Sequence, residues 1–168
     1  LPFSAANVTL NHVYEVHVPH EGKKVHTEAV FQGLVLRCKT AAPPAEDILL
    51  HARSDAQPGD AAGRDTFFAR FAVSTETGTD CALFLTPEFR EMLAALERFT
   101  QGTIESAALR GGVLTLALRT KYRFASIPEH LDARDIAGLR RWYAATLQDM
   151  TRILDTLLKN AAFFAADK

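Results

Sequence analysis

Residues 113–124 alternate between two kinds of side chain more clearly than most of this sequence does. The even positions are occupied by Leu114, Leu116, Leu118, Thr120, Tyr122 and Phe124. The odd positions are occupied by Val113, Thr115, Ala117, Arg119, Lys121 and Arg123. A period of two predicts a β-strand with distinct faces. Gly111-Gly112 separates this strand from an apolar run at 104–109, which is typical of a hairpin. The chain is therefore expected to build an antiparallel sheet.

Five further segments are predicted as strands. Residues 13–18 alternate apolar Tyr14 and Val16 with Glu15 and His17, which indicates one wet face. Residues 25–38 form a long apolar run interrupted by Gly33, where we expect a bulge or a close backbone contact. The remaining strands are expected at 48–51, 67–75 and 81–85, with a surface loop at 54–64.

Two helices are predicted. Thr86 can cap a helix that has Pro87 at its first position and that Gly102 would stop. Its apolar stripe is Phe89, Met92, Leu93, Leu96 and Phe99. Asp132 can cap a longer helix from about 133 to 158, with a stripe formed by Ile136, Leu139, Tyr143, Leu147, Met150, Leu154 and Leu157.

The long helix exceeds the width of one small sheet. At 1.5 Å per residue it measures about 39 Å, so part of it is expected to project or to pack against another chain. Trp142, Ile153 and Leu158 would widen its apolar arc. A homodimer through this helix is one of the partnerships that the sequence suggests.

These elements predict an α+β fold: a twisted, mostly antiparallel sheet of about seven strands, one inserted helix and a long C-terminal helix. A length of 168 residues favours a single domain, residues 1–168, with the strands concentrated in 11–125. Nineteen basic and twenty acidic residues leave a net charge of −1, so we expect no nucleic-acid partner. No apolar stretch in the sequence approaches the ~18 residues of a spanning helix.

Four of the six histidines, at positions 12, 17, 20 and 26, fall within fifteen residues. Imidazoles are common metal ligands, but alternation allows at most His17, Glu15 and a cross-strand His26 to converge. No HExxH or paired CxxC motif accompanies them, so solvated histidines are expected and neither a metal nor another cofactor is assigned. Cys38 and Cys81 lie in apolar runs and are predicted to be buried, unpaired thiols.

No catalytic residue can be assigned from motifs. The sequence contains no GxSxG nucleophile elbow and no glycine-rich phosphate loop. The aromatic cluster Phe67, Phe68, Phe71 and Phe84 is interpreted as core rather than as a ligand pocket.

The candidate binding residues are Arg119, Lys121 and Arg123, which project from one face of the last predicted strand as a basic stripe. Such a stripe can contact a phosphate group or an anionic membrane surface. The favoured alternative is that a charged outer row protects an edge strand from pairing with another molecule.

Several motifs together resemble a bacterial family, domain-of-unknown-function family 3137 (DUF3137). They are T-E-A-V-F-Q-G-L at 27–34, Asp65 with Phe67, Phe71 and Val73, A-L-F-L-T-P at 82–87, G-G-V-L-T-L-A at 111–117, Phe124, and N-H-V-Y at 11–14. The likeness covers most of 11–125. The family usually has a longer polar insertion before its F-x-G-L and an acidic residue where this chain has Ala125.

The resemblance implies no activity and no catalytic residues. It implies the soluble part of a membrane-associated bacterial protein at the cytoplasmic face of the inner membrane, and a first residue Leu1 suits a piece of a longer chain. We expect a non-enzymatic interaction or scaffolding module that contacts a protein partner or an anionic membrane surface. The alternative is a small-molecule or metal-dependent enzyme whose site is assembled from dispersed residues.

Overall fold

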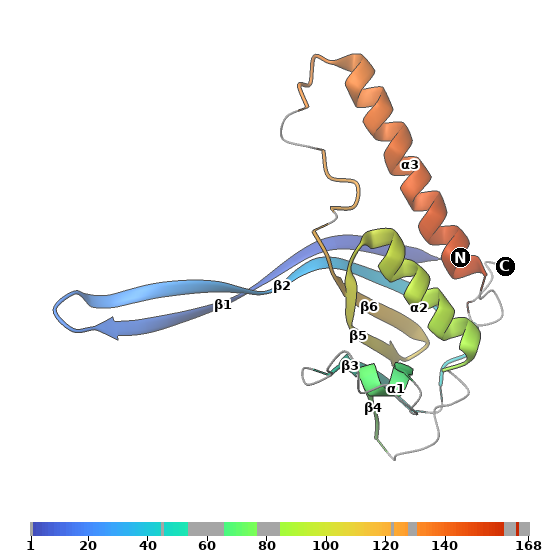
Figure 1. The fold of residues 1–168 in the computed structure, drawn as a ribbon, viewed down its shortest axis with the longest axis horizontal. Coiled ribbons are helices and arrows are strands. Elements are labelled where there is room, and N and C mark those ends of the chain that lie inside the picture. Colours follow the sequence, from blue (N-terminus) through green and yellow to red (C-terminus); the bar gives the residue numbers. More distant parts are fainter. Residues whose placement is uncertain are drawn as a thin grey trace.

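The computed structural model describes residues 2–44, 46–53, 66–76, 85–121, 123–127, 131–159 and 164. These residues form an α+β fold in which helices pack on one antiparallel sheet, as the sequence predicts (Figure 1). The elements in chain order are β1 Phe3–Val18, β2 Gly22–Lys39, β3 Ile48–Ala52, α1 Thr66–Arg70, β4 Phe71–Thr75, α2 Pro87–Thr100, β5 Thr103–Arg110, β6 Val113–Arg119 and α3 Ile136–Leu158. The described residues thus supply six of the about seven expected strands.

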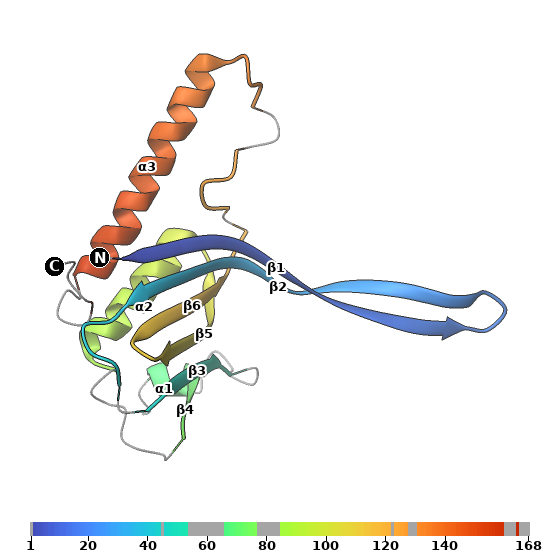
Figure 2. The ribbon, with the colours of Figure 1, turned by 180° about the vertical axis from the view of Figure 1, so that it is seen from behind.

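The sheet has the strand order β1-β2-β6-β5-β3-β4, so β1 and β4 are its edges and β6 is central. The β5–β6 hairpin turns at Gly111 and Gly112, whose φ angles of 52° and 74° suit the primed turns that glycine favours. Figure 2 shows the side of the sheet that faces away from α2 and α3.

The core lies between the sheet and its helices. Alternate residues of the two central strands, Leu34 and Leu36 of β2 and Leu114, Leu116 and Leu118 of β6, are at most 1% exposed. The alternation that predicted β6 therefore describes a strand with one face in the core. Phe89, Met92, Leu93 and Leu96 of α2 complete this layer, which confirms the predicted stripe.

The boundaries of α2 follow its capping residues. Thr86 Oγ1 accepts a hydrogen bond from the Phe89 N–H at 3.3 Å, and Pro87 begins the helix. The helix ends at Thr100, because Gln101 takes the left-handed conformation with φ 50° and the Gly102 N–H donates to the Glu97 carbonyl. The prediction of this helix was correct at both ends.

The long helix begins three residues later than predicted. Asp132 caps a preceding turn, where its carboxylate accepts the Arg134 N–H, and Asp135 caps α3 by accepting the Gly138 N–H at 2.8 Å. Ile153 and Leu157 near its C-terminal end are fully buried, whereas Ile136, Tyr143 and Leu147 are exposed. The N-terminal half of α3 therefore projects beyond the sheet, as its length suggested (Figure 1).

Three strand predictions were wrong in extent. The strand predicted at 13–18 begins ten residues earlier, as β1 at Phe3. Residues 67–70 form helix α1 rather than a strand, and the pairing of β4 with β3 begins at Phe71, opposite Ala52, the last residue of β3. Strand β6 ends at Arg119 instead of Phe124, directly opposite Thr103, where β5 begins. The predicted strand at 81–85 lies, except for Leu85, outside the described residues.

Gly33 marks a close backbone approach, as its position in the apolar run predicted. A Cβ atom at this position would lie 1.9 Å from the Leu118 carbonyl oxygen and 3.0 Å from the Phe31 ring. Any side chain here must push β2 away from β6. Gly33 stands at the last paired position between these strands, opposite Arg119.

The Gly33→Ala substitution is therefore expected to lower the free energy of unfolding by about 1–3 kcal/mol, the usual cost of overpacking. Urea unfolding monitored by circular dichroism measures this change. Gly111→Ala is the matched control, because a Cβ there meets no atom within 4 Å and only the positive φ adds strain. A loss at Gly33 no larger than that at Gly111 would contradict the close approach.

Candidate functional site

The most prominent feature of the surface is a two-stranded arm formed by residues 10–18 of β1 and 22–31 of β2. Strand β6 pairs with β2 only from Gly33 to Lys39, so the arm has no third strand among the described residues. It extends about 27 Å from Leu10 to Val18, at 3.3 Å per residue, and points away from both helices (Figures 1 and 2). An isolated two-stranded hairpin is only marginally stable in water.

The arm exposes apolar side chains on both faces. Leu10 is 54% exposed, Val13 60% and Val25 66%, and Tyr14, Val16 and Val30 are also exposed. The predicted strand at 13–18 thus has two wet faces instead of one, because it lies beyond the helical layer. Exposed apolar residues gathered on one hairpin in this way indicate an interaction surface.

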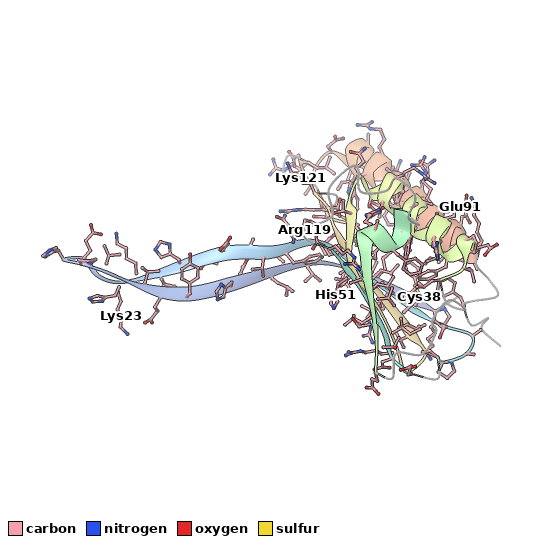
Figure 3. All side chains as sticks on the ribbon, turned by 60° about the horizontal axis from the view of Figure 1, so that its bottom comes forward. Lys23, Cys38, His51, Glu91, Arg119 and Lys121 are labelled. Carbon is pink, nitrogen blue, oxygen red and sulfur yellow. The ribbon has the colours of Figure 1, made fainter. Side chains whose placement is uncertain are left out.

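The arm turns at its tip through Pro19 and His20. The Glu21 N–H donates to the Val18 carbonyl at 3.1 Å, and His20 has a φ of 69°. A proline at the second position of a turn and a positive φ at the third position are features of a type II turn. Lys23 lies near this end of the arm and forms an ion pair of 3.0 Å with Glu15 (Figure 3).

The histidines of the arm are exposed and do not gather as the sequence allowed. His26 lies opposite Tyr14 in the strand register, on the face away from His17 and Glu15, so those three residues cannot converge. Tyr14 instead stacks between His12 and His26, with ring centroids 5.2 and 5.6 Å away. No group of three His, Cys, Asp or Glu side chains suited to a metal occurs among the described residues.

Arg119 fastens the base of the arm. The strand register skips Val30, which is an extra bulged residue in β2 between the pairs Leu10–Phe31 and Asn11–Ala29. Arg119 Nη2 donates to the Val30 carbonyl at 2.9 Å, and its Nε bonds Glu105 Oε1 at 2.5 Å. The bond to Glu105 also raises the pKa of Arg119 above its ordinary value. Figure 3 places Arg119 where the arm leaves the sheet.

The three predicted binding residues do not form one row. Because β6 ends at Arg119, Lys121 lies in a bend and Arg123 follows beyond the strand. The alternative interpretation was also wrong, since β6 is a central strand and needs no edge protection. Arg119 and Lys121 line a groove of about 890 Å³ together with Arg152 and Asp149, whereas Arg123 lines a smaller hollow beside Asn7.

Three positively charged side chains line the groove, those of Arg119, Lys121 and Arg152, and both arginines lie close to a carboxylate. Arg119 bonds Glu105, and Arg152 lies 3.8 Å from Asp149. Its other walls are the end of α2, the start of β5 and Gln32 of β2. This pairing weakens the attraction of the groove for an anion, because each nearby carboxylate partly cancels the positive potential of its arginine.

The aromatic cluster belongs mostly to the core, as predicted. Phe71 is 3% exposed and Phe67 9%, with ring centroids 4.9 Å apart, and Phe84 lies outside the described residues. Phe68 is the exception: it is exposed, and the Arg90 guanidinium lies 4.8 Å from its ring. Arg70 joins α1 to α2 through two bonds to Glu97, which also accepts the Ile104 N–H at 2.7 Å.

Cys38 is a buried free thiol, as the sequence predicted, and it is 1% exposed. Burial raises the pKa of Cys38 from 9.0 to about 11, because the thiolate loses its hydration. A thiol with this pKa is a poor nucleophile at neutral pH. Cys81 lies outside the described residues.

Sequence reasoning did not find the arm. Its pattern, with Val13 and Val16 beside histidines and a single carboxylate, looks like an ordinary half-buried strand. The signal that was available is the charged and polar composition of 22–28, where Lys23, Lys24, His26 and Glu28 lie among few apolar residues.

Comparisons with protein-family models, with curated proteins and with solved structures find no match. The resemblance to domain-of-unknown-function family 3137 therefore remains a prediction that rests on the residues quoted above. None of the described helices combines the length and the apolar character that crossing a bilayer requires.

The raised pKa of Cys38 predicts a pH dependence of stability. Between pH 9 and about 11 the unfolded chain loses the thiol proton and the folded chain keeps it, so the free energy of unfolding falls as pH rises. Unfolding titrations should show a steeper fall above pH 9 in the wild type than in Cys38→Ala. Equal slopes in the two proteins would contradict the shift.

The contact between Arg119 and Val30 predicts that Arg119→Ala loosens the arm. Amide hydrogen exchange at residues 10–18 and 22–31 should accelerate about twofold to tenfold, the factor for a hydrogen bond of about 0.5–1.5 kcal/mol. Arg110→Ala is the matched control, because Arg110 also ends a strand and pairs with an exposed carboxylate, Asp47. If both variants leave arm exchange unchanged, Arg119 has no fastening role.

Proposed function

We propose that this chain is a non-enzymatic interaction module that presents its β1–β2 arm to a protein partner. The observation that carries this proposal is the arm itself: exposed apolar side chains on a hairpin that supports no part of the core. Such a surface gains free energy when a partner removes it from water.

A protein partner is favoured over an anionic membrane surface. The groove that contains Arg119 and Lys121 is partly neutralised by Glu105 and Asp149. The arm carries only Lys23 and Lys24 as permanent cations, and each forms an ion pair with a glutamate of the arm or its turn. Apolar contact and strand pairing are therefore its stronger means of binding.

We include in this proposal the setting that the family resemblance implies, the cytoplasmic face of the bacterial inner membrane. A module with an arm about 27 Å long can contact a partner that stands beside its own body. The support for this setting is the sequence resemblance alone.

Photo-crosslinking tests the proposal. Benzoylphenylalanine at position 14 replaces an exposed tyrosine of the arm, and the same residue at position 143 replaces an exposed tyrosine of α3 as the matched control. In bacterial cells that contain the full-length protein, we expect discrete protein adducts from position 14 and none from position 143. Adducts from position 143 alone would show that α3, and not the arm, contacts the partner, which contradicts the proposal. The absence of adducts from both positions would also contradict it.

An arm-deletion variant shows whether the arm also stabilises the fold. Leu10 and Phe31 lie directly opposite each other, so Asn-Gly can replace residues 11–30 as a two-residue turn. We expect a melting temperature within a few degrees of the wild type, because every residue of the core cluster lies outside the deleted segment.

A further inference from the structure

The outer edge of β1 is unpaired along the arm. No described strand lies beyond β1 in the sheet, so one row of its backbone N–H and C=O groups faces outward. Natural proteins usually protect such edges with lysine, proline or a short strand length. A long unprotected edge can therefore pair with another strand.

The two edges of the arm differ in this protection. Strand β1 is 16 residues long and contains no lysine, arginine or proline, and its one carboxylate, Glu15, already pairs with Lys23. The opposite edge, in β2, carries Lys23, Lys24 and Glu28 within residues 22–31. Charged side chains thus disfavour strand pairing at the β2 edge, whereas the β1 edge lacks this protection.

We propose that β1 of the arm pairs antiparallel with β1 of a second copy of this chain, so that two arms form one four-stranded sheet. This inference rests on the proposed function and names its partner. A two-fold axis perpendicular to the sheet relates the copies, and pairing consumes the β1 edge of both, so the assembly closes as a dimer.

The sequence of β1 is complementary to itself when the two-fold axis is centred on Val13. Such an axis pairs residues of the same face, and centring it on Val13 places Val13 opposite its own copy and Leu10 opposite Val16 of the partner. The same register sets His12 opposite Tyr14 of the partner, which would join the two ring stacks that the arms already carry. Aromatic and β-branched cross-strand pairs of this kind stabilise sheets.

Two registers nearer the tip of the arm match less well. Centring on Glu15 opposes two carboxylates, and like charges directly opposite are destabilising. Centring on Val16 leaves only residues 14–18 overlapped, because β1 ends at Val18. The Val13 register overlaps residues 8–18, and it pairs Leu10 with Val16 on one face and Val13 with its copy on the other; all three are exposed in the single chain.

Analytical ultracentrifugation of the purified chain tests the pairing. We expect a species of twice 18.5 kDa. Val13→Lys should weaken it at least tenfold, since two lysines would then meet at the axis. Val25→Lys is the matched control: Val25 is 66% exposed against 60% for Val13, but it lies on β2, so the dimer should persist.

A cysteine tests the register directly. In a Cys81→Ser background, Val13→Cys should form an intermolecular disulfide under mild oxidation, because directly opposed Cα atoms in an antiparallel pair lie about 4.5–5.5 Å apart. Val25→Cys should remain largely reduced. Cross-linking of both variants to the same degree would overturn the register.

The remaining outcomes separate this inference from the proposed function. A wild-type monomer at every concentration overturns the dimer, and so does a dimer that Leu147→Lys in α3 abolishes while Val13→Lys does not. If the monomer still gives position-14 adducts with a different protein, the proposed function stands and only the second copy is excluded. A monomer that binds anionic vesicles through the arm overturns both proposals.

Discussion

The pairing of β2 with β6 is the constraint on which the rest of the structure depends. Strand β2 is 18 residues long, but β6 accompanies it only from Gly33 to Lys39. Over those residues β2 is a central strand with Leu34, Leu36 and Cys38 in the core. Before Gly33, over residues 22–31, the same strand is one half of the arm and pairs only with β1 among the described strands. The end of β6 at Arg119 therefore separates a body that is stabilised by packing from an arm that is stabilised by β1–β2 pairing and by the contact of Arg119 with Val30.

Much of the body could be predicted from the sequence because its signals are local. The Thr86-Pro87 start of α2, its apolar stripe and the Gly111-Gly112 turn each act within a few residues. The free thiol of Cys38 and the close backbone contact at Gly33 also followed from their neighbours. Local capping, turn chemistry and periodicity are properties that a single sequence displays.

The arm and the basic residues could not be predicted because they depend on where other strands end. Alternation in 113–124 continues past Arg119, yet β6 stops there, opposite Thr103, the first residue of β5. Likewise, Val13 and Tyr14 have the pattern of a half-buried strand, and both faces of the arm are exposed because no described helix packs against it. Strand extent is set by partners far apart in the sequence, and propensity does not report it.

The bulge at Val30 has a mechanical consequence. A bulge bends its strand and increases the local twist, and Arg119 holds this one from the body through the Val30 carbonyl. The arm therefore leaves the body at a bend that one arginine holds. A change of about 5° in this bend displaces the tip by about 2 Å over the roughly 27 Å of the arm. The direction in which the arm points thus depends on the contact between Arg119 and Val30 as well as on the pairing of β1 with β2.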